Sequence, residues 1–404
     1  MSQEHRQPWR WHYTGANSVT RRRGASRGRW GTTLRSGHSL AADPQLAVAE
    51  LHEAIAQPKA ALVAFFCSSN FDLDELAGQI NSRFQGIPVI GCTTAGEIGP
   101  AGYRSGSLAG FSIPARGFTA STTCIDGLAD FDEVCAREAT TGLLHGVDGR
   151  AERSFAFLLA DGLCGREERL TFLLQRALGD VAVVGGSAGD DERFAATHVF
   201  ANGSFRSDRA VLAAITTSRP FTVFRTSHFV AASAPLVVTD ADPARRLIRE
   251  INGRPAAAEY ARVTGLSRAE LDSVHFAAAP LVVRIDGSDY VRSVRHANPD
   301  GSLTLYCAIE RGVVLRVARG ADMLASRRRL FEDIHQHIGK PQLTLGFDCI
   351  HCQLEAVRTD GKAAVSQLFA DNNVVGFSTY GEQFVGVHVN QTFTGVAIGR
   401  RKAP

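Results

Sequence analysis

The chain has 404 residues, which is enough for two or three domains and a large buried core. Hydrophobic residues make up 44% and charged residues 21%, as in ordinary globular proteins, and no stretch approaches the roughly 18 uncharged apolar residues of a membrane-spanning helix. The net charge of +3 comes from the N-terminal segment, and the rest is mildly acidic without a basic stripe. Composition therefore excludes an integral membrane protein and argues against a nucleic-acid-binding body.

The N-terminal segment, residues 1–40, differs from the rest. It holds eight arginines against a single acid, Glu4, together with all three tryptophans. It has no hydrophobic period and no apolar stretch typical of a secretory signal. Three interpretations stay open: a disordered tail, an upstream mis-assigned start, or a basic arm for nucleic acid or anionic lipid, of which we prefer the first two. Without an export signal, the eight cysteines are expected to be reduced thiols in a cytoplasm.

Three copies of one motif follow along the chain. Each is a short apolar strand that leads into a loop of small residues ending in glycine and an acid. The copies occupy residues 88–97, 183–190 and 374–382, and their acids are Glu97, Asp190 and Glu382.

The surroundings of the motif also repeat. A buried strand and then a helix are predicted before each copy, and a further strand after it. The first strands are 61–67, 154–160 and 343–349, the helices 73–84, 166–178 and 362–369, and the last strands 107–113, 210–216 and 385–399. A strand, a crossover helix and a strand favour parallel neighbours. The second copy adds a hairpin that turns at Asn202-Gly203.

A different stretch separates the second and third copies. Residues 236–263 are predicted as strand, helix, short strand and helix. Strands follow at 280–287, 290–297 and 302–309, another begins at Gly312, and a helix covers 321–338. The sequence therefore predicts an α/β protein with mixed sheets from repeated strand-helix-strand units, divided into domains at 41–230 and 231–404.

Two motifs invite a catalytic or metal-binding interpretation. Residues 185–189 match the G-x-S-x-G nucleophile elbow with Ser187 as nucleophile, but that motif needs a helix directly after the serine, and a loop and hairpin are predicted here. Cys349, His351 and Cys352 offer soft ligands without an evident second pair, so buried thiols at a strand end are preferred over zinc or redox chemistry. No phosphate-binding glycine motif is present, and we expect no enzyme.

The acids and the last predicted strand point to a ligand. Glu97, Asp190 and Glu382 could bind a ligand amine or cap backbone N–H groups, and both alternatives stay open. On a single strand over 385–399, Gly386, His388, Asn390 and Thr392 share one face and apolar residues the other, close to Tyr380 and Glu382. Polar groups on an apolar wall are typical of a small-ligand pocket, with a half-exposed edge strand as the alternative.

These motifs together resemble the FIST family, with consecutive N- and C-terminal FIST domains. The residues that carry the resemblance are GCTTAGEI (91–98), VVGGSAGDDERF (183–194), VFANG (199–203), INGRPAAAEY (251–260), PLVVR (280–284), VGFSTYGEQ (375–383) and HVNQT (388–392). It covers roughly residues 45–400. The resemblance implies a non-enzymatic sensory module of bacterial signal transduction that binds a small ligand.

Within the family, FSTYGEQFVGVHVNQTFTG (377–395) is most similar to the nitric-oxide-sensing branch. That likeness implies haem b as cofactor and a histidine kinase or a cyclic-di-GMP synthase or phosphodiesterase as partner. The partner would act in trans, because the chain carries no kinase, cyclase or receiver signature. A haem ligand is normally His or Cys, which makes His388 the first candidate and His198 and Cys349 the alternatives. The other hypotheses are a FIST module for an amino-acid-like metabolite and a serine hydrolase.

Overall fold

The computed structural model describes residues 33–146, 154–232, 234–285 and 287–400. Most of the predicted tail lies outside these ranges, but its last residues include the strand β1 (Arg35–Ser39), which pairs with a later strand. Within the described ranges, no helix combines the length and apolar character needed to cross a membrane.

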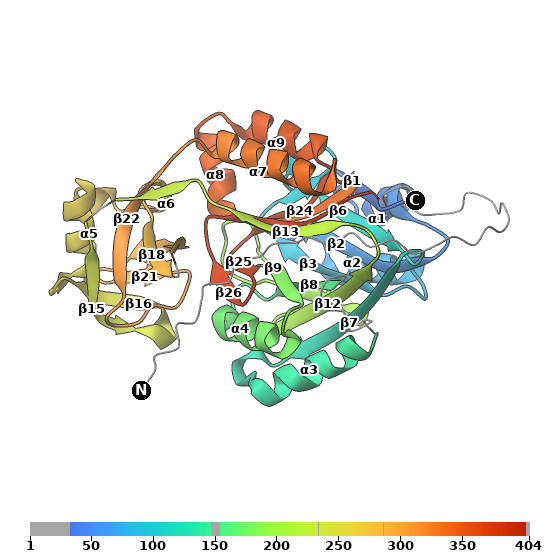
Figure 1. Cartoon of the computed structure of the whole chain (residues 1–404), viewed down its shortest axis with the longest axis horizontal. Coiled ribbons are helices and arrows are strands. Elements are labelled where there is room, and N and C mark those ends of the chain that lie inside the picture. The colour runs from blue at the N-terminus through green and yellow to red at the C-terminus, as the bar shows by residue number, and fades with distance from the viewer. Residues whose placement is uncertain (1–32, 147–153, 233, 286, 401–404) are drawn as a thin grey trace, which may run out of the picture. The chain divides into compact units, whose positions relative to one another are not determined.

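Three repeats with the same order of elements make up most of the described chain (Figure 1). Each repeat is an edge strand, a helix, a strand, one or two helices, a strand, a hairpin and a last strand. Repeat one comprises β1, α1 (Pro44–Ile55), β2 (Ala60–Ser68), α2 (Leu73–Arg83), β3 (Val89–Thr94), β4 (Glu97–Gly99), β5 (Gly102–Arg104) and β6 (Leu108–Pro114). Repeat two comprises β7 (Phe118–Asp126), α3 (Glu133–Gly146), β8 (Ser154–Ala160), α4 (Glu167–Leu178), β9 (Ala182–Ser187), β10 (Val199–Ala201), β11 (Ser204–Arg206) and β12 (Arg209–Thr217).

Repeat three is interrupted after its first strand. It comprises β13 (Phe221–Thr226), α7 (Met323–Ile338), β23 (Leu343–Cys349), α8 (Ile350–Arg358), α9 (Lys362–Asp371), β24 (Val374–Thr379), β25 (Glu382–Phe384), β26 (Val387–Val389) and β27 (Phe393–Ile398). Between β13 and α7 lies a segment that we call the inserted module. It contains β14 (Phe229–Ala231), β15 (Leu236–Asp242), β16 (Leu247–Ile251), β17 (Arg254–Pro255), α5 (Ala256–Thr264), α6 (Ser273–Ala278), β18 (Leu281–Ile285), β19 (Ser288–Arg292), β20 (Val294–Ala297), β21 (Leu303–Leu305) and β22 (Val314–Gly320).

The described strands form three six-stranded sheets, one for each repeat, and a nine-stranded sheet in the inserted module. Each repeat sheet has a parallel pair at its centre, β2 with β3, β8 with β9 and β23 with β24, as the strand-helix-strand pattern predicts. The hairpins, however, are exchanged in a ring. Repeat one receives β10–β11 from repeat two, repeat two receives β25–β26 from repeat three, and repeat three receives β4–β5 from repeat one.

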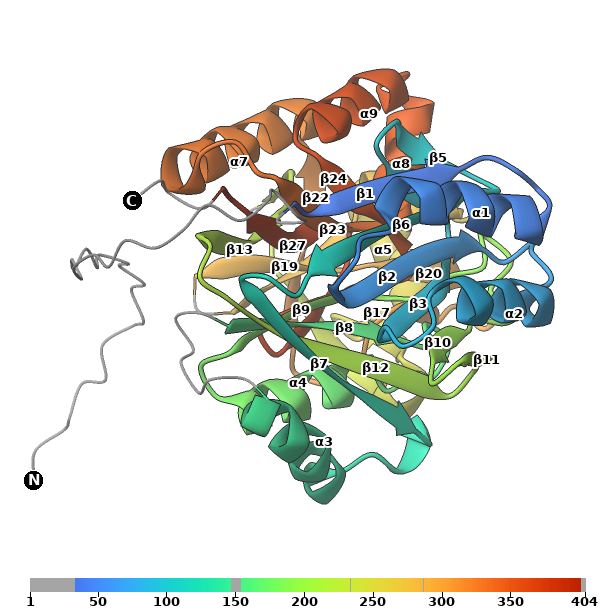
Figure 2. The same cartoon turned by 90° about the vertical axis from the view of Figure 1, so that its right-hand side faces the viewer.

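The three sheets share one central core. Along β2, Leu62, Ala64 and Phe66 enter this core, while Val63 and Phe65 face the other side and pack under α1 and α2. The inner faces of β8 and β23 contribute to the same core, and α3 with α4 and α7 with α8 and α9 cover the outer faces (Figure 2). Because both faces are buried, these strands are continuous apolar runs, which is why the sequence predicts them well.

Several helices begin at an aspartate that accepts a backbone hydrogen bond. Asp43 accepts from Leu46 N (2.7 Å) before α1, and Asp322 from Ala325 N (2.9 Å) before α7. Such caps contribute about 1 kcal/mol each. The predicted turn at Asn202-Gly203 is confirmed, since both residues have positive φ (52° and 80°) between β10 and β11.

The structure corrects two local predictions at this level of the fold. The first helix predicted within 236–263 is only a single turn at Pro243–Arg245, followed by the strand β16 that pairs with β15. The Cys349–Cys352 motif lies at a strand end as predicted, since Cys349 ends β23, but it also lies at a helix start, which the prediction excluded, because α8 begins directly after β23. Cys349 is the N-cap residue of α8, so no loop separates the two elements.

Candidate functional site

The three motif loops bind one another through their backbones. Each loop lies where the chain leaves one sheet to add its hairpin to the next. The hydrogen bonds that join them run from Ala95 N to Ser378 O (3.0 Å), from Ser187 N to Gly381 O (2.8 Å) and from Gly189 N to Thr93 O (3.0 Å). A Cβ on Gly189 would lie 2.7 Å from Ala95 N, so this approach requires a residue without a side chain.

Two of the motif acids have matching hydrogen bonds. Glu97 accepts from Thr94 Oγ1 (2.5 Å) and, with its other oxygen, from Ser107 N (3.0 Å) and Oγ (2.6 Å). Glu382 accepts from Thr379 Oγ1 (2.5 Å) and from Thr392 N (3.2 Å) and Oγ1 (2.7 Å). Both carboxyl groups are buried, and burial raises the pKa of Glu97 to about 7 and that of Glu382 to about 8.

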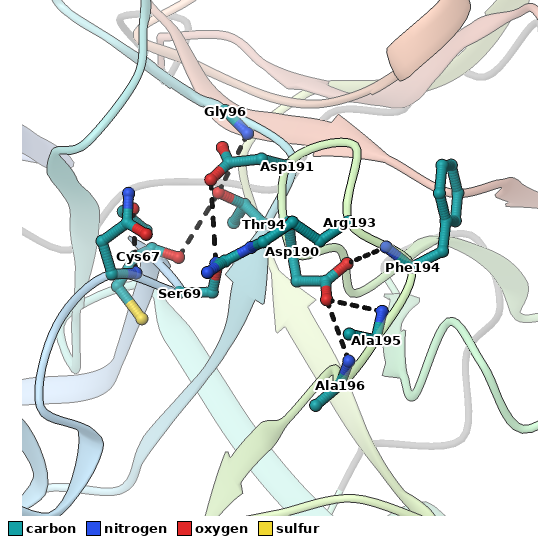
Figure 3. A network of polar contacts seen from close by, with 12 residues as sticks. Cys67, Ser69, Thr94, Gly96, Asp190, Asp191, Arg193, Phe194, Ala195 and Ala196 are labelled. Carbon is teal, nitrogen blue, oxygen red and sulfur yellow. Dashed lines mark hydrogen bonds and ion pairs between the residues drawn. The ribbon is translucent and has the colours of Figure 1, made fainter.

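The third acid, Asp190, organises the loop that follows it (Figure 3). Its carboxylate accepts from the backbone N–H groups of Phe194 (2.9 Å), Ala195 (2.8 Å) and Ala196 (2.9 Å), and from the hydroxyl of Tyr380. The oxygens of all three acids thus have partners within the motif surroundings, as the loop-capping alternative expects.

The single strand predicted over 385–399 is wrong. It divides into β26 and β27, because Val385, Gly386 and Gln391 all have positive φ (46°, 82° and 50°), which no continuous strand allows. Thr392 therefore does not continue the face of His388, and it binds Glu382 instead. β26 lies at the edge of its sheet, yet His388 is 2% exposed, since α4 and β19 pack against β26.

His388 and Asn390 carry buried polar atoms that lack partners. No hydrogen bond of ordinary length and angle joins the ring nitrogens of His388 or the amide atoms of Asn390 to another described residue, although the backbone of Glu382 lies close enough to act on the imidazole. Their side chains lie against the backbone of Gly381, where a Cβ would be 2.3 Å from His388 Cε1 and 3.2 Å from Asn390 Nδ2. Burial lowers the pKa of His388 to about 4, so the imidazole is neutral at pH 7. Two buried groups that can each donate and accept therefore have no ordinary hydrogen-bond partner among the described residues.

A charged clamp lies next to His388. At the start of α4, Glu168 accepts from Ala308 N (2.7 Å) and from Arg246 (2.7 Å), and Arg246 also binds Glu167. Arg246 donates as well to the carbonyl of Tyr306 (2.7 Å). The clamp fixes the inserted module against repeat two beside the unpartnered groups.

Aromatic side chains from repeat two, the inserted module and repeat three form a row of ring contacts that begins at Tyr380. Phe194 stacks on Tyr380 with ring centroids 4.3 Å apart, Tyr306 lies 5.7 Å from Phe194, and His351 lies 5.1 Å from Tyr306. Phe194 has φ of 50°, which is strained for an aromatic residue and is maintained by the Asp190 bonds. Arg295 covers the Phe194 ring at 4.9 Å.

The other predicted site residues lie apart from this cluster or are engaged elsewhere. His198 binds Thr93 through its backbone (3.0 Å), and its Nδ1 has no partner in the described ranges. Cys349 and Cys352 are buried, which raises the pKa of both thiols, and no group of three or more His, Cys, Asp or Glu among the described residues is placed to hold a metal ion.

Ser187 lacks the geometry of a nucleophile elbow. Its Oγ accepts from Gln383 Nε2 (2.8 Å), and residues 188–198, all of them described, contain no helix. The structure thus brings together Tyr380, His388, Asn390 and, through Tyr380, Asp190. Sequence reasoning considered His351 only as a metal ligand and missed Phe194, Tyr306, Arg295 and Arg292, whose charge acts on His388. The available signal for the arginines was a pair of them in a strand-like run.

Comparison with known families identifies two consecutive domains in this chain. The FIST N domain model matches residues 61–254 and the FIST C domain model matches residues 256–385, which together span about four-fifths of the chain. A sequence comparison with curated proteins finds no match. FIST domains are sensory domains of signal transduction, and this chain belongs to the FIST family.

Proposed function

We propose that this protein senses a small polar metabolite, which binds where repeats two and three meet the inserted module. The observation that carries the proposal is the set of four buried, unpartnered polar atoms on His388 and Asn390. Buried polar groups in native proteins are nearly always hydrogen-bonded, because each unpaired one costs about 1–3 kcal/mol. A ligand that supplies donors and acceptors would remove this cost. Sites of this kind are common between domains.

The site residues favour a ligand other than an amino acid. Capture of an ammonium group needs a free carboxylate, and the oxygens of Glu382, Glu168 and Asp190 already accept hydrogen bonds from protein groups. The family assignment supports a sensory role, and we propose that the signal passes in trans to a histidine kinase or a cyclic-di-GMP synthase or phosphodiesterase.

Haem is the second candidate, because the ring nitrogens of His388 are free to act as a ligand. The surroundings fit it less well. A porphyrin needs apolar walls, whereas the charges of Glu168, Arg246 and Arg292 act on His388 and its ring lies against Gly381. Haem titration of the whole chain would support haem if a Soret band forms, disappears in His388→Leu and persists in His198→Leu. Absence of the Soret band would exclude haem as the ligand.

A matched pair of substitutions tests the polar site without knowledge of the ligand. Asn390 and Asn372 are both buried, but Asn372 accepts from His335 Nε2 (2.7 Å) and donates to Leu368 O (2.8 Å). We expect Asn390→Leu to raise the free energy of unfolding by about 1–2 kcal/mol and Asn372→Leu to lower it by a similar amount. Urea denaturation of both variants measures the difference.

The ligand itself is tested with a metabolite library in a thermal-shift assay. A compound that raises the Tm of the wild type and not that of Asn390→Leu supports the site. If Asn390→Leu destabilises the protein as much as Asn372→Leu does, Asn390 is a satisfied structural amide and the proposal fails.

A further inference from the structure

Three arginines near the proposed site have no carboxylate partner. Arg225 on β13, Arg292 on β19 and Arg295 on β20 form no ion pair among the described residues. Arg225 lies over the ring of Tyr290 at 4.3 Å, and one of its terminal nitrogens is buried without a hydrogen bond. Arg295 lies over Phe194. All three guanidinium groups keep their charge without a counter-ion from the protein.

Two of the three arginines lie beside the exchanged hairpin that carries His388, and the third lies over Phe194, which stacks on Tyr380. Arg225 also approaches the ring of Phe384 on β25 at 5.8 Å, and β19, which carries Arg292, packs against β26. The positive charge of Arg292 acts on His388 and contributes to its lowered pKa. Arg295 is linked through Phe194 to Tyr380, which lies shortly before this hairpin in the chain.

The carboxylates of Glu167, Glu168 and Glu382 do not neutralise the three arginines, because each already binds another group of the protein. Glu167 and Glu168 both bind Arg246, and the second oxygen of Glu168 accepts from Ala308 N. The oxygens of Glu382 accept from Thr379 and Thr392. These three carboxylates are therefore already bound by protein groups, whereas Arg225, Arg292 and Arg295 form no ion pair among the described residues, next to a neutral imidazole.

A cation kept partly out of water is costly unless an anion pairs with it, and a guanidinium forms two parallel hydrogen bonds with a carboxylate or phosphate. We infer that the ligand of this site is a small anion, with a carboxylate or phosphate group bound by Arg292 and its remaining polar atoms by His388 and Asn390. The inference rests on the proposed function and names its ligand class. A cationic ligand would meet the positive charge of Arg292 and find the carboxylates of Glu168 and Glu382 already bound by protein groups.

The test uses the whole chain and four probes in a thermal-shift and calorimetry series. Succinate, succinamide and 1,4-diaminobutane share a four-carbon chain but are anionic, neutral and cationic, and inorganic phosphate separates phosphate from carboxylate recognition. We expect succinate or phosphate to raise the Tm at millimolar concentration, and the two other probes to leave it unchanged. In Arg292→Gln the affinity for that anion falls about 10- to 100-fold, as expected for a lost charged hydrogen bond.

The matched control is Arg284→Gln. Arg284 lies on the neighbouring strand β18, is exposed and pairs with Asp289 (3.0 Å), so its loss leaves the anion affinity unchanged. No response to either anion at 50 mM, or equal losses in the two variants, overturns the inference. A Tm increase with succinamide or diaminobutane that Asn390→Leu abolishes also overturns it while leaving the proposed function intact. Failure of the proposed function is seen separately, from the sign of the Asn390→Leu effect without ligand.

Discussion

Tyr380 of repeat three donates its hydroxyl hydrogen to the carboxylate of Asp190 in repeat two, 190 residues earlier in the chain. The same hydroxyl oxygen accepts from the backbone N–H groups of Asp190 (3.2 Å) and Phe194 (3.3 Å). Burial and the neighbouring carboxylate both raise the pKa of Tyr380, so the phenol stays protonated and remains a donor. One side chain therefore joins two repeats and positions the ring on which Phe194 stacks.

Tyr380→Phe removes this hydroxyl, so that Asp190 Oδ1 keeps only the bond from Phe194 N and the backbone N–H of Asp190 loses its acceptor. We expect a loss of about 1–3 kcal/mol in the free energy of unfolding and faster hydrogen exchange at the amides of residues 194–196. The control is Tyr260→Phe, which removes a hydroxyl bonded to Ala279 O (2.7 Å) in the inserted module. It should lower stability without changing exchange at 194–196. Equal exchange in both variants would show that Tyr380 does not hold the loop.

Gly381→Ala tests the close packing of His388. A Cβ there must displace the imidazole, so we expect a loss of about 1–3 kcal/mol and a changed chemical shift of the His388 ring in NMR spectra. Gly78→Ala is the matched control, because the position lies within α2 and a Cβ there meets nothing within 4 Å. It should stabilise the protein by about 0.5–1 kcal/mol. A neutral Gly381→Ala would mean that His388 is free to move.

The raised pKa of Glu382 makes stability depend on pH. Its pKa is about 8 in the folded protein against an ordinary 4.5, because burial favours the protonated carboxyl. The folded state then binds more protons than the unfolded state between these values. Its contribution to stability is therefore fully present below about pH 4.5 and lost as pH rises through about 8. Glu382→Gln should lose less stability than the wild type between pH 5 and 8 in urea titrations. If the stability of Glu382→Gln and that of the wild type change with pH in the same way, Glu382 does not ionise in this range in the folded protein.

His388 has the opposite dependence. Its pKa is lowered from 6.5 to about 4 by burial, so the unfolded state binds more protons between these values. Stability from this site is present above about pH 6.5 and is lost as the pH falls through about 4. We expect His388→Gln to flatten the acid side of the stability profile between pH 4 and 6.5. If His388→Gln loses as much stability in acid as the wild type does, the His388 imidazole is exposed to water and its pKa is not lowered.

The sequence predicts the buried strands and their crossover helices because apolar runs and amphipathic spacing are local signals. Three-residue strands such as β4 and β25 are too short for any period, so the first and third hairpins were missed. α8 was missed because it begins directly after β23, with a cysteine as its N-cap. Which sheet receives which hairpin depends on contacts between distant segments, and no local pattern encodes it.

The candidate site was predicted only where it lies on the repeated motif. Tyr380 lies in the third copy and His388 and Asn390 follow it closely in the chain, whereas Phe194 and Arg295 reach the same place from repeat two and the inserted module. An arginine in a strand pattern is ordinary on a solvated face. Its missing counter-ion becomes visible only when the packing is known.

The ring of exchanged hairpins makes the order of the chain differ from the order in space. A chain ending after β12 would complete only the sheet of repeat one, leaving β4–β5 without β24 and β9 without β25. The two family models meet after residue 254, inside the inserted module, so that junction is no folding boundary. Each repeat sheet is therefore complete only with a hairpin from another repeat. Any shift of the hairpin that carries His388 strains the sheet of repeat two, to which this hairpin is paired.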